Sequence, residues 1–518
     1  MKKTIVALAV LLAIAGLPAN QENIWSSSPE KVANIVSLID QKYFKAADQE
    51  QLVYASIRGA LDTLDPHSYF LDPEGFSRMQ EDYTAKYYGL GIQITKYEDR
   101  LVVVTPIEGT PAYRLGVLPG DVISQINGES TKPLSSYDAM QKLRGPKGTK
   151  VTITIVRESL EKPLDLTFTR EEIPLNSISY AFMLNDTSGY IYIRNFAETT
   201  TAEFEEKMAG LVKRGMKSLI LDLRGNGGGA FFQSLALSDE FLPGGAVIVS
   251  IRGRNKTYDK EFRAENNNQY EKLPLVVLID QGSASASEIV SGAVMDNDRG
   301  LVVGEDSWGK GLVQTMFRLD SNLAVALTTA KYYTPSGRSI QRDYTHLDDY
   351  YMKKETQESQ REIRYTAKGR KVLGQGGITP DYKVEFLLKP LTAEIRFKGA
   401  FFSYARKFSA HQTELAKKYV FPGEPAAAEP SGKIVVSRGF MVDAAVVDDF
   451  KTYLKTLKFE PAPEKFLEAL PEIKRELERE IVSSLWTLEE GRRVFCLKDP
   501  VVLKALDVIP EAAKFIEQ

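Results

Sequence analysis

The chain has little of the two side chains that most often carry redox, metal-binding and acid–base chemistry. Its 518 residues include one cysteine, Cys496, and three histidines. A single cysteine excludes an intramolecular disulfide. Cys496 lies in the stretch RRVFCLKD, among apolar and charged helix formers. This setting indicates a packing residue and not a nucleophile.

The chain also lacks a strong charge of either sign, because its formal net charge at pH 7 is −3. This balance excludes the basic footprint of a nucleic-acid-binding protein, so we expect no nucleic-acid partner. Hydrophobic residues make up 43% of the chain and charged residues 26%, which is an ordinary globular composition. At typical domain sizes, this length predicts about three or four domains.

Long apolar runs are absent after the N-terminus, so no later stretch is suited to span a bilayer. The N-terminus reads MKKTIVALAVLLAIAGLPAN. Two lysines precede an apolar run from Thr4 to Leu17, and LPA at residues 17–19 offers a small-residue cleavage site. This order predicts a signal peptide over residues 1–19. We therefore expect an exported protein, periplasmic or secreted, that stays attached to the membrane if the segment is retained.

Hydrophobic periodicity predicts a multidomain α/β protein. SPEKVANIVSLIDQKYF has a helical pattern, TKVTITIVRES alternates as a strand, and short apolar runs such as KSLILDL alternate with helical patterns. The predicted segments are a helical N-terminal region (20–83), a small β-rich domain (84–160), an α/β domain (161–384) and a helical C-terminal extension (385–518). We expect the charged insertion at 342–375 to be exposed or mobile, and the Pro/Ala/Gly-rich stretch 421–433 to be a linker.

A glycine-rich turn, LILDLRGNGGGAFF, joins a predicted strand to a predicted helix. Dense glycine brings bare N–H groups close to a ligand. Gly225-x-Gly227-x-x-Ala230 fits a dinucleotide-binding loop, and the same N–H groups would suit an oxyanion hole. A tight turn with no ligand explains the pattern equally well.

The stretch LIDQGSASASEIVSG places three serines, Ser283, Ser285 and Ser287, between a predicted strand and a predicted helix. Ser285-x-x-Glu288 fits a capping box, with Ser285 as the N-cap. A hydroxyl at a helix N-terminus also lies at the positive end of the helix dipole, which suits a nucleophile that forms an oxyanion. The local pattern leaves both interpretations open.

A nucleophilic serine needs a base. His67, His346 and His411 all lie outside the glycine-rich and serine-rich turns, which gives a histidine base little local support. Lys310 lies between two glycines in GEDSWGKGLVQT, and Gln314 follows four residues later. A buried lysine can lose its proton and act as a base, and the Gln314 amide would orient it. Taken alone, Lys310 is better explained as a surface lysine.

The stretch YYGLGIQI places Gly89, Leu90, Gly91 and Ile92 at the entry to a predicted strand. Successive N–H groups in such a loop hold a carboxylate, while the strand edge pairs with an extended peptide. The ordered downstream stretches GTPAYRLGVLPGDVISQINGE and LRGPKGTKV weaken the alternative of an ordinary glycine turn.

Together these stretches resemble the C-terminal processing peptidases, also called tail-specific proteases. The ordered likeness covers roughly residues 30 to 385. It includes GALDTLDPHSYFLDPEGF, YYGLGIQI, LILDLRGNGGG, GSASASEI, VVGEDSWGKGLVQ and YYTPSGRSIQ. DSWGKG departs from many relatives, the insertion splits SGRSIQ from GGITPDYKV, and the C-terminal extension has no recognised motif.

The resemblance implies a serine–lysine dyad. By it, Ser285 is the nucleophile, Lys310 is the general base and Gln314 orients the lysine. The oxyanion hole would consist of the N–H groups of Gly229 and Ala286.

The resemblance also implies a PDZ domain over residues 84–160 and a serine protease core over 161–384. The PDZ domain would bind substrate C-termini at Gly89–Ile92, and Arg144 would couple it to the protease. No metal or organic cofactor is implied. The partners are protein substrates with accessible C-termini, and a homo-oligomer or an adaptor protein stays open. A non-catalytic PDZ adaptor and an exported dinucleotide enzyme are the alternative hypotheses.

Overall fold

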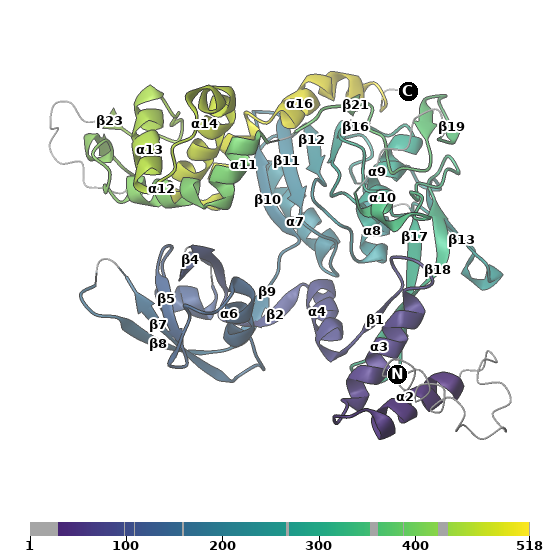
Figure 1. The fold of residues 1–518 in the computed structure, drawn as a ribbon. Coiled ribbons are helices and arrows are strands. Elements are labelled where there is room, and N and C mark those ends of the chain that lie inside the picture. The colour runs from purple at the N-terminus through teal and green to yellow at the C-terminus, as the bar shows by residue number, and fades with distance from the viewer. Residues whose placement is uncertain are drawn as a thin grey trace, which may run out of the picture. The chain divides into compact units, whose positions relative to one another are not determined.

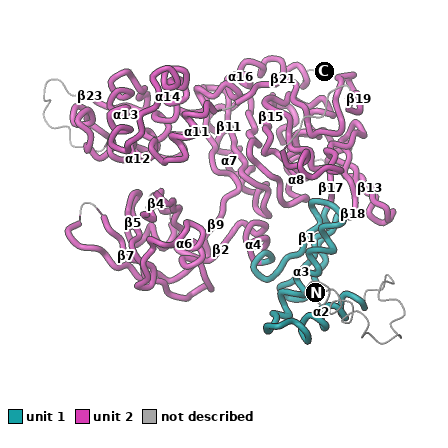
Figure 2. The backbone as a smooth tube through the Cα atoms, viewed as in Figure 1, with its two compact units in different colours: residues 1–76, 314–328 teal, residues 77–313, 329–518 magenta. Residues whose placement is uncertain are grey.

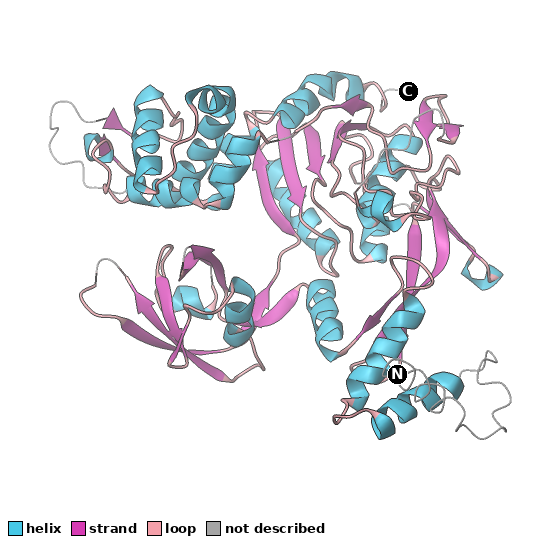
Figure 3. Cartoon of the chain, in the orientation of Figure 1, coloured by secondary structure: helices cyan, strands magenta, loops and turns pink. Residues whose placement is uncertain are grey.

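The structure, a computed structural model, describes residues 30–97, 99–107, 109–157, 160–265, 269–352, 361–386, 388–422 and 434–516 (Figure 1). The predicted signal peptide and most of the predicted linker 421–433 lie outside the described residues. The chain divides into two compact units (Figure 2). Unit 1 contains residues 1–76 and 314–328, and unit 2 contains residues 77–313 and 329–518. Helices and strands alternate through most of the chain (Figure 3), which confirms a mixed α/β fold.

Unit 1 is built on two helices and part of a hairpin. Its elements are α2 (Glu30–Lys42), α3 (Gln49–Leu61), β1 (Tyr69–Leu71), the start of α4 (Pro73–Thr84), most of β17 (Leu312–Arg318) and the first half of β18 (Ala324–Tyr333). β1 pairs antiparallel with β18, with Tyr69 opposite Ala326. Tyr54, Leu61 and Phe70 form its small apolar core.

The β-rich domain in unit 2 is a sheet with the strand order β3-β4-β5-β7-β8. Its elements are β3 (Ile92–Tyr97), β4 (Arg100–Pro106), α5 (Pro111–Arg114), β5 (Val122–Ile126), β6 (Glu129–Ser130), α6 (Ser136–Leu143), β7 (Lys150–Val156) and β8 (Leu164–Thr169). The sheet extends beyond the expected boundary at residue 160, because β8 pairs with β7 along its whole length. β2 (Lys86–Gly89) and β9 (Glu171–Pro174) pair with each other and connect this domain to the chain on either side.

The α/β domain is a sheet with the strand order β10-β11-β12-β15-β16-β21. Its strands are β10 (Ile178–Met183), β11 (Ser188–Ile193), β12 (Ser218–Asp222), β15 (Leu275–Ile279), β16 (Leu301–Gly304) and β21 (Tyr382–Lys383). All neighbours are parallel except β10, which pairs antiparallel with β11. The parallel strands follow chain order, so right-handed crossovers place their helices on one face. These helices are α7 (Thr200–Lys213), α8 (Phe231–Asp239) and α9 (Ala286–Asp296).

The opposite face of this sheet is covered by the end of the chain. The helices there are α15 (Leu488–Cys496) and α16 (Pro500–Ala513), and α16 lies over β12, β15 and β16 (Figure 1). Val502 and Ala505 pack against Val276 and Val303 in a shared apolar cluster. Cys496 is buried in the same cluster, in the packing role that we predicted. The last part of the C-terminal extension therefore completes the core of the α/β domain.

The rest of the C-terminal extension forms a helical body with its own apolar cluster. Its elements are α11 (Pro390–Phe397), α12 (Ala400–Ser409), the 3-10 turn η3 (Ala416–Lys418), β22 (Tyr419–Val420), β23 (Ile434–Val435), α13 (Ala444–Thr456) and α14 (Pro463–Leu485). Phe401, Tyr404, Phe408 and Phe450 stack in its centre. In the part of the chain that the structure describes, no helix is both long and apolar enough to cross a membrane.

The remaining elements of unit 2 include the strand that pairs with the second half of β18. They are β13 (Val247–Gly253), the 3-10 turn η1 (Lys256–Tyr258), β14 (Lys260–Arg263), α10 (Leu347–Tyr351), β19 (Ile363–Tyr365) and β20 (Lys371–Leu373). β13 pairs antiparallel with β18. Most described residues of the insertion 342–375 are exposed, but Tyr350 is fully buried and Arg342 is 4% exposed. Composition alone did not indicate this, because these side chains pack on Trp308, more than thirty residues earlier in the chain.

Candidate active site

Three sequence motifs meet at one edge of the parallel sheet. The glycine-rich turn follows β12, the serine-rich turn follows β15 and the lysine turn follows β16. These strands are parallel neighbours, so their carboxyl ends lie together. Ligand sites in α/β sheets form at this edge. The fold therefore gathers residues that are about eighty positions apart in the chain.

Two of the three serines fasten the serine turn to the glycine-rich turn. Ser283 Oγ donates to the carbonyl oxygen of Leu223 at 2.8 Å, and Ser287 Oγ donates to that of Asn226 at 2.8 Å. The N–H of Ala284 also donates to the Asn226 carbonyl, at 3.0 Å. Ser283 and Ser287 are fully buried. These bonds agree with the prediction that both serines are turn residues without chemistry of their own.

Ser285 has a strained backbone, with φ of 55° and ψ of −111°. Non-glycine residues rarely adopt positive φ, and such strain collects at functional sites. Ser285 is the N-cap of α9 and is only partly buried, whereas both neighbouring serines are buried. The turn therefore presents the middle serine of SASAS at the start of a helix.

The glycine-rich turn approaches Ser285 closely. A Cβ atom on Gly228 would lie 2.8 Å from Cβ of Ser285, and one on Gly229 would lie 2.0 Å from the carbonyl oxygen of Phe196. Only glycine fits at these two positions, both of which have positive φ. Among the described residues, the N–H groups of Gly229 and Ala286 have no protein acceptor. Two bare donors thus lie beside the Ser285 turn.

One buried carboxylate joins the serine turn to the lysine turn. Glu288 Oε2 accepts the N–H of Ser285 at 2.8 Å and that of Lys310 at 2.9 Å. Its Oε1 accepts the Ser307 hydroxyl at 2.5 Å and the Gly309 N–H at 2.6 Å. The backbone nitrogens of Ser285 and Lys310 therefore share one oxygen as their acceptor. Burial raises the pKa of Glu288, and the bonds from Ser307, Lys310 and Gly309 oppose that rise.

A tyrosine from β18 joins the same two residues through their carbonyl groups. The Tyr332 hydroxyl donates to the carbonyl oxygen of Lys310 and lies 3.3 Å from that of Ser285. Burial, followed by the charge of Glu288, raises the pKa of Tyr332 well above its usual value, so the hydroxyl stays protonated. Ser285 and Lys310 are thus linked by their N–H groups through Glu288 and by their carbonyl groups through Tyr332.

The insertion supports the lysine turn from outside. The guanidinium of Arg342 lies 4.8 Å from the ring centroid of Trp308 and donates to the Trp308 carbonyl. Trp308 Nε1 donates to the Tyr350 hydroxyl at 3.0 Å. The N–H of Trp308 donates to the Ser283 carbonyl at 2.8 Å. Trp308 is therefore a packing contact between the lysine turn, the serine turn and the insertion.

Gln314 lies on β17, in unit 1, and follows Lys310 by four residues in the chain. Its Nε2 donates to Oγ1 of Thr328 at 3.4 Å. The N–H of Tyr332 donates to the carbonyl of Gly311, so the pairing of this hairpin continues toward Lys310. In an extended strand, residues two apart project to the same side. Gln314 therefore projects to the same side of β17 as Leu312 and Met316.

The predicted peptide-binding loop forms a tight turn before an edge strand. Gly91 has φ of 77°, and a Cβ atom there would lie 2.3 Å from Thr110. Leu90 is buried in the core of the β-rich domain, and Ile92 begins β3. Among the described strands, β3 pairs only with β4. One edge of β3 is therefore left for an added strand, and α6 contacts β3 on this domain.

Lys96 on β3 bonds to the segment that precedes α6. Its ammonium donates to the carbonyl oxygens of Lys132 at 2.6 Å and Leu134 at 2.7 Å, and lies 3.3 Å from that of Thr131. These carbonyls directly precede α6. Lys96 thereby fixes the start of α6 relative to β3.

Arg144 ends α6 and contacts the connecting segments of the β-rich domain. Its Nη1 forms an ion pair with Glu81 of α4 at 2.5 Å. Its guanidinium lies 4.2 Å from the ring centroid of Tyr87 on β2. A Cβ atom on Gly89 would lie 3.8 Å from the Arg144 side chain. Arg144 therefore touches both the peptide-binding end of the domain and the segments that leave it.

The comparisons with known proteins identify the family. Residues 187–350 match peptidase family S41 and residues 102–157 match the PDZ domain. The chain is 37% identical over 326 residues to a carboxy-terminal-processing protease of Bartonella bacilliformis, a match that covers 62% of this chain and 74% of that protein. It is 34% identical over 343 residues to the carboxy-terminal processing protease CtpA of Bacillus subtilis, covering 65% and 73% of the two chains. The chain belongs to the carboxy-terminal processing protease family.

A solved structure of a photosystem II D1 C-terminal processing protease is also similar, with 27% identity and a TM-score of 0.36. That match covers 68% of this chain and 86% of the other. The two family matches and the two curated relatives confirm the expected family, its protease class and its PDZ domain. The PDZ match lies within the sheet β3–β8, and the S41 match contains the serine and lysine turns.

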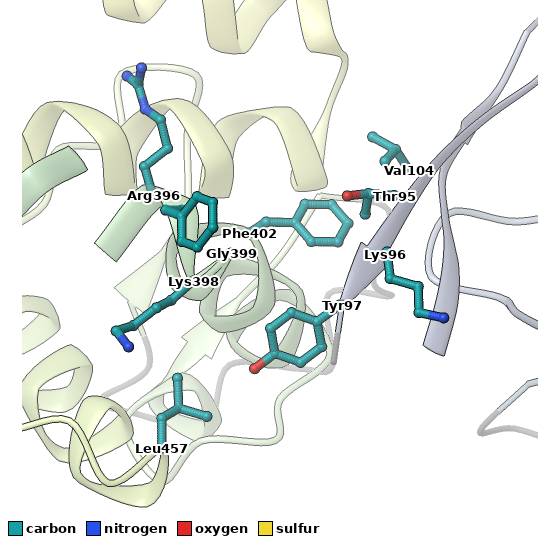
Figure 4. Close-up of a pocket in the computed structure, with 10 residues that line it drawn as sticks. Thr95, Lys96, Tyr97, Val104, Arg396, Lys398, Gly399, Phe402 and Leu457 are labelled. Carbon is teal, nitrogen blue, oxygen red and sulfur yellow. The ribbon is translucent and has the colours of Figure 1, made fainter. Parts of the chain in front are cut away.

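In this processing protease, the C-terminal extension also borders the PDZ domain. A cavity of about 500 Å³ lies between β3 and β4 on one side and α11 and α12 on the other (Figure 4). Tyr97 lies against Gly399, where a Cβ atom would be 3.1 Å from the ring. Gly120 lies against the Arg406 guanidinium, which leaves no room for a side chain. No sequence pattern indicated this contact, because the extension carries no recognised motif.

The sequence also left the roles of two residues unrecognised, Glu288 and Tyr332, at the sheet edge that carries the serine and lysine turns. It assigned Glu288 only to a capping box, and the Ser285 N–H bond confirms that local role. The bonds from Glu288 to Gly309 and Lys310 span 21 and 22 residues, and the contact of Tyr332 with Ser285 spans 47. A capping motif predicts the bond between Glu288 and the Ser285 N–H. It does not predict the bonds to Gly309 and Lys310 or the contact of Tyr332.

We expect Glu288→Gln to lower kcat/KM by about 10- to 100-fold, because an amide NH₂ would face N–H donors and displace Ser285 or Lys310. The raised pKa of Glu288 has a second consequence. The folded protein holds that proton more tightly than the unfolded chain, so this group's contribution to stability is greatest at low pH and is lost as pH rises through the raised pKa. Acidification protonates Glu288 in the wild type and so disturbs the alignment of Ser285 and Lys310. Protonation of this group does not itself unfold the protein.

The measurement is kcat/KM of both proteins across pH, together with the melting temperature. We expect the activity ratio of wild type to Glu288→Gln to shrink as pH falls. Glu394→Gln, an exposed helix position, is the matched control. Equal activity of wild type and Glu288→Gln at neutral pH would contradict the assigned role.

Proposed function

We propose that this family member is an exported serine endopeptidase that cleaves proteins near their C-termini through an acyl-enzyme on Ser285. The observation that carries the proposal is the double link between Ser285 and Lys310, through the Glu288 carboxylate and the Tyr332 hydroxyl. A strained serine held beside a lysine turn is the arrangement that a serine–lysine dyad requires.

In this mechanism, Oγ of Ser285 attacks the scissile carbonyl carbon while its proton passes to the neutral amine of Lys310. The tetrahedral intermediate collapses, the C–N bond breaks, and Lys310 returns the proton to the leaving amine. Lys310 then takes a proton from water, which attacks the ester carbonyl carbon. The C–Oγ bond breaks, Lys310 returns the proton to Oγ of Ser285, and the acid is released. Gln314 would accept a hydrogen bond from the Lys310 amine and orient it. All these groups belong to the chain, and no metal or cofactor takes part.

The oxyanion hole is assigned to the N–H groups of Gly229 and Ala286. Ala286 is the first residue of α9, so its N–H lies at the positive end of the helix dipole. The close approach of Gly228 to Ser285 brings the glycine-rich turn beside this N–H, 3.1 Å from the position of a Gly228 Cβ. This contact favours an oxyanion hole over a dinucleotide loop for the glycine-rich turn.

Substrate C-termini would bind at Gly89–Ile92 in the PDZ domain. The N–H groups of the turn suit a terminal carboxylate, and the open edge of β3 suits an extended peptide. Ile92 and Ile94 on β3 and Leu134 before α6 are partly buried apolar side chains of this domain. Apolar residues at a substrate C-terminus would suit these side chains.

We expect Ser285→Ala and Lys310→Ala each to lower the cleavage rate about a thousandfold or more, because each removes a group that takes part in the reaction. The substrate is an unfolded protein with an apolar C-terminus, and cleavage is followed by mass spectrometry. Both variants should still bind a peptide with that C-terminus.

Ser321→Ala and Lys331→Ala, at exposed positions, serve as controls and should keep the wild-type rate. Wild-type activity in either dyad variant would exclude this mechanism. Peptide binding without turnover by the wild type, whatever the substrate, would favour the alternative of a non-catalytic PDZ adaptor.

Arg144 is proposed to couple the PDZ domain to the protease through Glu81 and Tyr87. We expect Arg144→Ala to lower cleavage of the substrate with an apolar C-terminus about tenfold, because a coupling contact is lost. Peptide affinity should change less than about twofold, because the proposed peptide-binding residues Gly89–Ile92 are kept. Peptide affinity is measured by fluorescence anisotropy. Lys132→Ala, an exposed position of the same domain, is the control. A loss of peptide affinity that accounts for all the lost activity would overturn the coupling role.

Export rests on residues 1–19, which lie outside the described part of the chain. When the full chain is produced in a bacterium, we expect a signal peptidase to remove this segment, because it has the order of a secretory signal. The mass of the purified protein and its cell fraction provide the measurement. An intact N-terminus on cytoplasmic protein would contradict export, and an intact N-terminus in the membrane fraction would indicate a retained anchor.

A further inference from the structure

The motif LDPHSYF at residues 64–70 has no part in the mechanism described so far. Asp65 organises its turn: Oδ1 accepts the N–H groups of His67 at 2.8 Å and Ser68 at 2.9 Å. Oδ2 accepts the Ser68 hydroxyl at 2.7 Å. A carboxylate that collects this many local donors acts as a fixed acceptor.

This fixed acceptor also bonds to the hairpin that carries Gln314. Oγ1 of Thr328, on β18, donates to Asp65 Oδ1 at 3.0 Å, and the N–H of Thr328 donates to the Ser68 hydroxyl at 3.1 Å. The pairing of Tyr69 with Ala326 sets this register. Oγ1 of Thr328 is in turn the acceptor for Nε2 of Gln314. Asp65, Thr328 and Gln314 therefore form one chain of hydrogen bonds within unit 1.

The direction of these bonds determines which way the Gln314 amide faces. A threonine hydroxyl has one proton, and Thr328 gives it to Asp65, which has only lone pairs to offer. Oγ1 of Thr328 can then only accept, so Gln314 must present its NH₂ group to it. The carbonyl oxygen Oε1 of Gln314 is thereby turned away from Thr328. An amide without this constraint can flip and exchange its donor for its acceptor.

We propose that Asp65 and Thr328 are positioning residues that fix the Gln314 amide with its carbonyl oxygen available to Lys310. This inference rests on the proposed function, in which Lys310 is the base. The base needs its lone pair for the Ser285 proton, so its N–H groups need an acceptor. An amide turned the other way would set its NH₂ group against them and would repel the protonated lysine.

The test is a double-mutant cycle with Thr328→Val and Gln314→Ala. Thr328→Val keeps the shape of the side chain and removes the hydroxyl. We expect it to lower kcat about tenfold with little change in KM, because one hydrogen bond near the reacting groups is lost and substrate contacts are kept. In the Gln314→Ala background, Thr328→Val should have an effect of less than about twofold. The pH profile of kcat/KM should shift in Thr328→Val, since the lysine environment changes.

Two further variants separate positioning from simple folding. Thr328→Ser restores the hydroxyl and should recover activity to within about threefold of wild type. Asp65→Asn, which can offer a donor to Thr328, should lower kcat as Thr328→Val does. Thr167→Val, in the PDZ sheet, controls for the loss of a threonine hydroxyl elsewhere. Melting temperature and binding of a C-terminal peptide show whether each variant folds.

The outcomes separate this inference from the proposed function. If Ser285→Ala and Lys310→Ala are inactive but Thr328→Val matches the wild type, the dyad stands and the positioning role is wrong. Additive effects of Thr328→Val and Gln314→Ala would overturn it as well. A loss in Thr328→Val that Thr328→Ser does not recover, with an unchanged pH profile, would show a packing role only. If both dyad variants stay active, the proposed function itself fails.

Discussion

The arrangement of the serine and lysine turns at the edge of the parallel sheet depends on one buried carboxylate, that of Glu288. The serine and lysine turns are loops at the ends of neighbouring strands, and sheet pairing does not reach them. Glu288 accepts hydrogen bonds from the N–H groups of both turns. Burial raises the pKa of Glu288, because a charged carboxylate is costly in a buried position. Four donors offset that cost. A buried acceptor with this many partners keeps both turns at a fixed separation, which packing alone does not ensure.

The rest of unit 2 supports this edge from several directions. The strain at Ser285 persists only because its surroundings over-determine it. Ser283 and Ser287 bond the serine turn to the glycine-rich turn, Gly228 packs against Ser285, and Trp308 of the lysine turn donates its N–H to Ser283. α15 and α16 cover the second face of the same sheet, so the C-terminal extension contributes to the core that carries the site. The insertion and the C-terminal extension, which carry no family motif, therefore support the sheet edge where the motifs lie.

The sequence was sufficient for features that depend on local order. Apolar runs such as LPLVVLID became buried strands, and Ser285-x-x-Glu288 became the start of a helix, because period and capping act over a few residues. Features that depend on distant partners were missed. Nothing near Tyr332 in the chain indicates that its hydroxyl contacts Lys310, and the polar composition around Tyr350 indicated exposure although Trp308 buries it. The assignment of Lys310 came from the resemblance, since a lone lysine has no distinctive pattern.

The hairpin of β17 and β18 shows how a two-residue period distributes these roles. Thr328 and Tyr332 lie four residues apart on β18, and Lys310 and Gln314 lie four apart on the opposite strand and its entry. Tyr332 bonds to Lys310, and Thr328 bonds to Gln314. Thr328 and Tyr332 share one face of β18, so this strand contacts both the Gln314 side chain and the Lys310 carbonyl group. A one-residue slip of β18 would turn Thr328 and Tyr332 to the other face, and the β1 pairing with β18 opposes such a slip. The short strand after LDPHS thus protects the register on which both bonds depend.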